Sequence, residues 1–273
     1  IAMGTESLKS ATDGSNNNSI SIGYRSQADV TDNSNNISIG NYALRVSQKK
    51  EHDNIAIGFE SMSEKKYGSK NIAMGSYAYK GVNNPTKWYG ESNLSIGFES
   101  MFDTSANFTI GIGEKALRKT LTDGSVAIGY ESQILSQDAS NNVSLGYKTL
   151  HSNVSGHENV AIGHESQINT TSNYNTSLGY NTLYSNISGP DNVAIGNKSQ
   201  FSGLTGISNI SLGNSTLYST SDGSHNVAIG HFSQNKNQSG YDNVSVGYKS
   251  QFDSHGNHNI SMGEDSLYFE KGS

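Results

Sequence analysis

The sequence predicts an all-β fold, a parallel β-solenoid of about sixteen rungs of roughly 17 residues each, which spans residues 1–273 as a single repeat domain. A short motif of the type Asn-Val-Ala-Ile-Gly recurs along the chain, and its glycine returns at nearly even spacing from Gly97 onward, as at Gly113, Gly129 and Gly146. The motif alternates apolar and small side chains, which is the period of a β-strand, and no segment shows a sustained helical period. Only 33% of the residues are hydrophobic, but their fixed spacing excludes a disordered chain.

The first element of each rung is a strand that ends at the glycine. Apolar residues stand one and three positions before it, as Val160 and Ile162 do, with a small residue such as Ala161 between them. We expect the aliphatic pair to fill the interior and the small residue to face outward. The glycine allows a positive φ or tight packing at a corner. Asn occupies 12 of the 15 available positions four residues before it, which predicts left-handed turn residues and a ladder of hydrogen-bonded side chains.

The second element follows the glycine. Two variable residues precede a small residue and then Leu, Gln or Met, as in Lys148-Thr149-Leu150, and this pattern predicts a second short strand. The remaining residues of each repeat are rich in Ser, Asn, Gly and Asp and predict a connecting loop. One repeat cannot bury its own apolar face, so the repeats must stack.

The length of one turn has two interpretations. Rungs such as Ala161 with Gln167 alternate with rungs such as Ser177 with Leu183. In a 34-residue turn, Gln would therefore stack on Gln and Leu on Leu. The residues two positions after each glycine alternate in sign along Glu99, Lys115, Glu131, Lys148 and Glu165. A 17-residue turn would place opposite charges next to each other. The charge pattern favours the shorter turn and leaves the longer one open.

The repeat resembles the head repeats of trimeric autotransporter adhesins, the YadA-like family, through its Asn-Val-Ala-Ile-Gly-x-x-Ser pattern. The stretch from Ser177 to Asn186 is equally similar to repeats of phage and algal-virus tail fibres. The resemblance covers nearly the whole chain and implies a left-handed parallel β-roll, three chains side by side, and attachment outside the cell. The adhesin heads differ in having a shorter repeat. We therefore expect an excerpt of a longer fibrous protein, at a cell or virion surface.

The predicted homotrimer contact is the row of small residues, because a smooth face allows close approach. It comprises Ala127, Ser144, Ala161, Ser177, Ala194, Ser211 and Ala228. The net charge of −6 without a Lys/Arg run argues against nucleic acid or anionic membrane as partners. The sequence also lacks an apolar run long enough to insert into a membrane.

One long connection, Lys80 to Ser92, interrupts the repeat and holds Pro85, Trp88 and Tyr89. Inserted loops of solenoids often form binding faces, and exposed aromatic residues suit contacts with a sugar or a protein. This loop is the predicted ligand-contact site, and it supports an alternative function as a head that binds a host glycan or a receptor. A loop that only covers the roll explains the same residues.

The sequence does not favour an enzyme. Acids such as Glu60 recur at a surface position, and Gly111-Ile112-Gly113 lacks the third glycine of a nucleotide-binding loop. A polysaccharide-active enzyme on a β-helix, the less favoured alternative, needs an irregular cleft. The Asn-x-Ser sequences at seven strand starts match a glycosylation sequon, but the repeat itself generates them. The predicted function is a structural or adhesive extracellular fibre segment without cofactor or metal.

Overall fold

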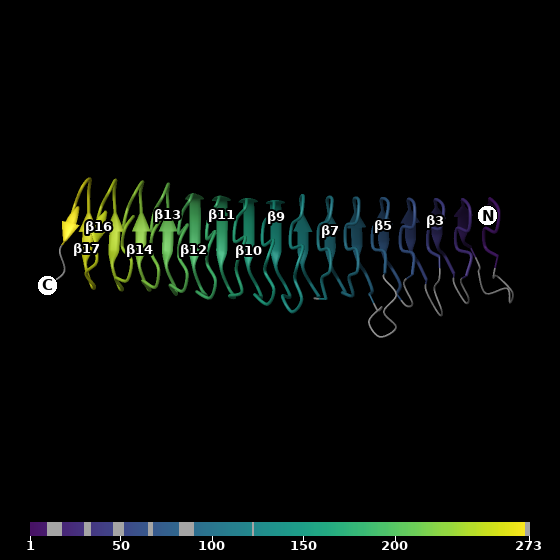
Figure 1. The fold of residues 1–273 in the computed structure, drawn as a ribbon, viewed down its shortest axis with the longest axis horizontal. Coiled ribbons are helices and arrows are strands. Elements are labelled where there is room, and N and C mark those ends of the chain that lie inside the picture. Colours follow the sequence, from purple (N-terminus) through teal and green to yellow (C-terminus); the bar gives the residue numbers. More distant parts are fainter. Residues whose placement is uncertain are drawn as a thin grey trace. The chain divides into compact units, whose positions relative to one another are not determined.

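The structure is a computed structural model that describes residues 1–9, 18–29, 34–45, 52–64, 68–81, 90–121 and 123–270. The described residues are all-β and form two compact units, Ile1–Asn141 and Asn142–Ser273. Within each unit the chain winds as a β-solenoid, and successive turns stack in chain order (Figure 1). Each turn contributes one short parallel strand, followed by a tight corner and a loop.

In the first unit eight strands lie side by side in sequence order. They are β1 (Ala2–Met3), β2 (Ile20–Ile22), β3 (Ile37–Ile39), β4 (Ile55–Ile57), β5 (Ile72–Met74), β6 (Leu94–Ile96), β7 (Ile110–Ile112) and β8 (Val126–Ile128). Ala56 of β4 pairs with Ser38 of β3 and with Ala73 of β5. The small residue of each rung therefore stacks on the small residue of the next.

The second unit repeats the arrangement and adds a small second sheet. Its long sheet contains β9 (Val143–Tyr147), β10 (Val160–His164), β11 (Thr176–Tyr180), β12 (Val193–Asn197), β13 (Ile210–Leu212), β14 (Val227–Ile229), β15 (Val244–Val246) and β17 (Ile260–Met262). On the last turns, β16 (Asp253–Ser254) pairs in parallel with β18 (Phe269–Glu270).

One turn of the solenoid contains one repeat. Gly163 of β10 pairs with Gly146 of β9 and with Gly179 of β11, and the adjacent small residues keep the same register. A 34-residue turn would skip one of these neighbours. The prediction of 17-residue rungs is confirmed.

The orientation of the strands is opposite to the prediction. The small residues Ala161 and Ser177 are fully buried, whereas the aliphatic residues beside them, Ile162 and Leu178, are half-buried and 45% exposed respectively. The same inversion recurs in both units. The small residue of the strand is buried, and the residues on either side of it are exposed or half-buried. The interior therefore holds the small row, and the aliphatic pair faces outward.

The segment after the glycine is a turn, so the predicted second strand is wrong. Glu165 and Gln167, two and four residues after Gly163, both have a φ of 50°, in the left-handed region. Their backbone still bonds to both neighbouring rungs, because Glu165 N donates to Tyr147 O at 2.9 Å and Gln167 N donates to Thr182 O at 3.0 Å. The left-handed residue near the ladder asparagine also lies one position earlier than expected, as at Glu158 and Tyr174.

The corner glycine is required for two reasons. Gly163 has a φ of 130°, and a Cβ there would lie 2.0 Å from the carbonyl oxygen of Gly179 on the next rung. Other residues would be strained by the φ and blocked by the backbone. Both parts of the prediction for this glycine, the positive φ and the tight packing, are confirmed.

Among the described non-glycine residues with a left-handed φ, none is Val, Ile or Thr. A β-branched side chain crowds the backbone in this region, so we expect Leu150→Ile, at a φ of 49°, to destabilise the chain. The strain should cost about 1–3 kcal/mol. The isosteric control Leu150→Met should cost less than about 1.5 kcal/mol. Urea unfolding followed by circular dichroism measures both, and equal losses would contradict the backbone explanation.

Candidate functional site

The asparagine ladder is the most regular feature of the interior. In the second unit Asn159 N donates to Asn142 Oδ1 at 2.8 Å, Asn175 N donates to Asn159 Oδ1 at 2.9 Å, and the series continues through Asn192, Asn209, Asn226, Asn243 and Asn259. The first unit has the same ladder from Asn36 through Asn54, Asn71 and Asn93. The predicted ladder is confirmed.

The side-chain nitrogen of most ladder asparagines binds a loop, whereas Asn259 Nδ2 on the last rung has no hydrogen-bond partner. Asn142 Nδ2 donates to Gly156 O, Asn209 Nδ2 donates to Gly223 O, both at 2.8 Å, and each acceptor lies three residues before the next ladder asparagine. A Cβ at Gly156 would lie 2.3 Å from Ser172 O, so glycine lets this loop pack closely on the loop of the next rung, although Ser172 O and Ala106 O serve as acceptors on other rungs. The sequence interpretation missed these loop glycines, although their recurrence seven residues before the corner glycine was a visible signal.

Removal of one ladder amide should destabilise the second unit. Asn192 is 1% exposed, accepts from Asn209 N at 2.9 Å and donates to Gly206 O at 2.8 Å. Asn192→Ala leaves both partners buried without a bond, at a cost of about 1–3 kcal/mol for each. The exposed Asn197→Ala should change the unfolding free energy by less than about 0.5 kcal/mol. An unchanged urea midpoint for Asn192→Ala would exclude a stabilising ladder.

Hydroxyl and amide groups fill much of the remaining interior. Ser166 Oγ bonds both Ser177 Oγ and Thr182 Oγ1, and Gln167 Nε2 donates to Ser177 Oγ at 2.8 Å. In the first unit the same part of the interior is more apolar, with Met101 and Leu117 in the core cluster. The pairing in the second unit is incomplete, because Gln167 Oε1 and both side-chain polar atoms of Gln251 have no hydrogen-bond partner, and a buried polar group without one is costly.

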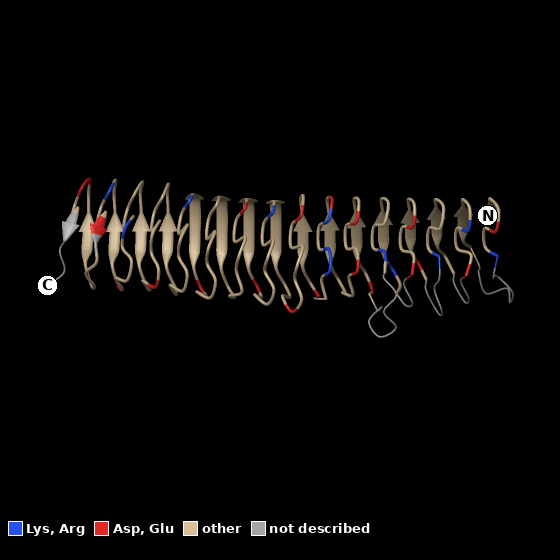
Figure 2. Ribbon diagram, viewed as in Figure 1, with Lys and Arg blue, Asp and Glu red and all other residues tan. Residues whose placement is uncertain are grey.

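The outer strand face carries the aliphatic pairs. We define it as the residues one and three positions before each corner glycine. In the second unit it includes Val143, Leu145, Leu178, Ile210 and Leu212, which are 39–46% exposed. The strands of the long sheet carry no Lys, Arg, Asp or Glu within the described ranges, and charges lie in the corners and loops (Figure 2). The outer strand face is therefore an uncharged apolar stripe.

Stacked aromatic rings border this face. Tyr147, His164 and Tyr180 follow the corner glycines of consecutive rungs, with ring centroids 4.8 and 5.1 Å apart and interplanar angles of 20° and 27°. Further along the corner, Phe201 stacks between Tyr184 and Tyr218. Because the rings cover each other's faces, they present mainly edges outward and stabilise the stacking of rungs.

The charges of the corners form surface ion pairs. Glu99 bonds Arg118 of the next rung at 3.1 Å, and Lys115 contacts the adjacent Glu114 at 3.4 Å. Exposed pairs of this kind contribute about 0–1 kcal/mol each. They contribute little to the stability of the fold, and the position of Glu99 agrees with the expectation that acids recur at a surface position of the repeat.

Hydrogen bonds between neighbouring corner side chains shift the pKa of four groups, Glu6, Arg25, Tyr130 and Lys249. The hydrogen bond from Arg25 lowers the pKa of Glu6, and the hydrogen bond with Glu131 raises the pKa of Tyr130. All four side chains stand on corner rows that face solvent. The shifts therefore follow from surface pairing and need no enclosed site.

The seven small residues predicted as the trimer contact are fully buried within their own chain. Ala127, Ser144, Ala161, Ser177, Ala194, Ser211 and Ala228 are each 0% exposed. A residue enclosed by its own rungs cannot touch another subunit, so this assignment is wrong. Side chains on the outer strand face are the ones available for contact. The predicted ligand-contact residues Pro85, Trp88 and Tyr89 lie outside the described residues.

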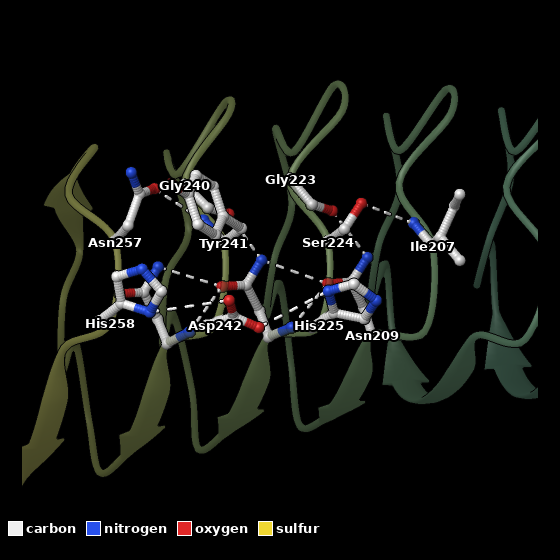
Figure 3. A network of polar contacts seen from close by, with 12 residues as sticks. Ile207, Asn209, Gly223, Ser224, His225, Gly240, Tyr241, Asp242, Asn257 and His258 are labelled. Carbon is white, nitrogen blue, oxygen red and sulfur yellow. Dashed lines mark hydrogen bonds and ion pairs between the residues drawn. The ribbon is translucent and has the colours of Figure 1, made fainter.

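The loop side of the second unit carries a polar network (Figure 3). Asp242 lies between His225 and His258 of the adjacent rungs, with Nδ1–Oδ distances of 3.5 and 3.6 Å. Tyr241 N donates to Asn257 Oδ1 at 3.0 Å beside it. The two imidazoles and the carboxylate are 44–68% exposed and form a solvated row of alternating His and Asp side chains.

Within the described ranges, no group of three or more His, Cys, Asp or Glu side chains is placed to bind a metal ion. The same ranges contain no helix of the length and hydropathy that crossing a membrane requires. Comparisons with protein-family models, with curated proteins and with solved structures found no match to this chain.

The buried position of the small row can be tested at Ala161. Ala161→Ser introduces the residue found on both neighbouring rungs and should leave the unfolding midpoint nearly unchanged. Ala161→Leu adds volume where no space exists and should cost about 1–3 kcal/mol. Urea unfolding over a hundredfold range of protein concentration separates chain stability from assembly. A wild-type midpoint for Ala161→Leu would refute the inward orientation.

Proposed function

We propose that this chain is a structural or adhesive segment of an extracellular fibre, assembled as a parallel homotrimer through the outer strand face. The observation that carries the proposal is the uncharged aliphatic stripe that each unit leaves exposed. Leu145, Leu178 and Leu212 recur on alternate rungs and are 43–45% exposed. Monomeric soluble proteins rarely expose contiguous apolar patches of this kind.

The repeat makes side-by-side association efficient. In a parallel arrangement every rung of one copy meets the same rung of the next, so a small contribution per rung adds up along the stack. In a dimer, the outer strand face of each chain, which is two side chains wide, is covered by one neighbour on one side only. In a trimer, the outer strand faces of three chains meet at one axis, and each face is covered by two neighbours. This fuller coverage favours a trimer over a dimer.

The same geometry and the resemblance to adhesin heads and viral tail fibres support the fibre role. The number of repeated rungs sets the length of each solenoid unit, while variable loops and corner residues are displayed along it. Those displayed residues are the natural contacts for a host glycan or protein. The regular rungs support a display scaffold better than a catalytic cleft.

Assembly can be tested with matched triple variants in the second unit. Leu145→Lys with Leu178→Lys and Leu212→Lys should convert a trimer, at three times the 29.2 kDa chain mass, into a folded monomer. Buried like charges on the shared axis would cost several kcal/mol. Sedimentation equilibrium gives the mass, and circular dichroism reports whether the chain stays folded.

The control places the same charges on another exposed apolar row. Val154, Ile187 and Leu204 lie in loops and are 39–51% exposed, so their replacement by Lys should leave the mass unchanged. A wild-type chain that is a folded monomer at micromolar concentration would contradict the trimer. Equal dissociation by both triple variants would contradict the assignment to the outer strand face.

A further inference from the structure

The ladder asparagines coincide with acceptor sequons for N-linked glycosylation. Seven of them begin an Asn-x-Ser sequence, namely Asn36, Asn93, Asn142, Asn175, Asn209, Asn243 and Asn259. A glycan is bulky and needs its asparagine at the surface. The structure places the first six of these side chains at 0–2% exposure, and Asn259 is half-buried on the last rung.

The ladder uses the nitrogen that a glycan would occupy. Asn142 Nδ2 donates to Gly156 O, and Asn142 Oδ1 accepts from Asn159 N, both at 2.8 Å. Asn209 makes the equivalent bonds to Gly223 O and from Asn226 N. An N-glycosidic bond replaces one of the two amide hydrogens and places a sugar ring inside the rung. Ladder and glycan therefore exclude each other.

Three more sequon asparagines are buried in the loops. Asn153, Asn186 and Asn237 are 0–1% exposed. In each, the side-chain oxygen accepts from the backbone nitrogen of the glycine three residues later, at 2.7–2.9 Å. The amide nitrogen of each donates to the carbonyl oxygen of the same glycine. A glycan at any of them would displace the loop that the ladder binds.

Burial comes too late to protect these asparagines during synthesis. The partner of Asn142 Oδ1 is 17 residues further along the chain. At a synthesis rate of about 5–20 residues per second, that partner emerges about 1–3 s later. During this time the ladder hydrogen bond that buries the sequon has no partner and cannot form. An oligosaccharyltransferase acting on the emerging chain would therefore meet the sequon before the rung can close.

We propose that N-glycosylation and folding are mutually exclusive for this chain, so that it folds where no oligosaccharyltransferase acts on it. It then reaches its site of action by a route that bypasses that enzyme. The inference rests on the buried sequon asparagines of the ladder and the loops and does not depend on the fibre role or on the trimer.

Three exposed sequons provide an internal control. Asn169, Asn197 and Asn214 begin Asn-x-Ser or Asn-x-Thr sequences, and their side chains face solvent. A glycan at these positions does not enter a rung. Their occupancy reports whether the transferase has acted on the chain.

The test directs the chain, behind a cleavable signal peptide, through the secretory pathway of a eukaryotic cell. Intact mass and amidase treatment, which converts glycosylated Asn to Asp, identify the occupied sites. We expect occupied ladder sequons and a yield of folded secreted protein at least about tenfold below that of cells treated with an inhibitor of glycan-precursor synthesis. The inhibitor arm uses the unaltered chain, so no variant has to fold.

A second arm removes the buried sequons and keeps the ladder. The substitution Ser→Ala at Ser38, Ser95, Ser144, Ser155, Ser177, Ser188, Ser211, Ser239, Ser245 and Ser261 destroys those sequons. At the strand positions Ala is already the residue of alternate rungs, such as Ala161 and Ala194. Because the variant also loses hydroxyls such as Ser177 Oγ, which Ser166 and Gln167 bind, its folded yield is compared with and without the inhibitor, and the two yields should be equal. Folded wild type that is secreted with its exposed sequons occupied and its ladder sequons empty would overturn the proposal, as would folded chains with glycosylated ladders.

Discussion

The fold depends on one repeated interaction, the buried asparagine amide that joins each rung to the next. Its oxygen accepts from the backbone of the following asparagine, and its nitrogen binds a loop carbonyl, so one side chain fixes both the strand start and the loop. Strands of three to five residues contribute few ladder bonds of their own. The side-chain ladder supplies the alignment that such short strands lack, and the 17-residue register follows from it.

The ladder also explains why the interior is narrow and polar. Two residues after the asparagine, the chain passes the small row, where Ala161 and its neighbours are fully buried. Across from it the corner supplies Ser166 and Gln167, which bond the next rung. Larger side chains do not fit at the small row itself, whereas the corner position of alternate rungs buries Leu150, Leu183 and Leu217. The aliphatic residues of the strands are therefore placed outside, on the outer strand face that the proposed trimer would cover.

Surface chemistry and interior chemistry are thus separated by position in the repeat. Corner and loop residues vary in charge and aromaticity, as in the row formed by His225, Asp242 and His258, without affecting the ladder. A scaffold built in this way can change what it displays while its rungs stay the same. The same separation places glycosylation sequons in the interior, because the ladder motif and the sequon share their residues.

The sequence by itself determined the period, the strand that precedes each glycine, the need for that glycine and the asparagine ladder. Each of these follows from local chemistry, such as the positive φ of Gly163 or the stacking of identical amides. Tertiary structure decided which face of the strand points inward. Alternation with a period of two defines two faces but not their environments, and hydrophobicity alone favoured Ile162 over Ala161 as the buried residue. The narrow cross-section of the rung reversed that choice, since only the small side chain fits opposite the corner. For the same reason the candidate contact surface moved from the small row to the aliphatic one.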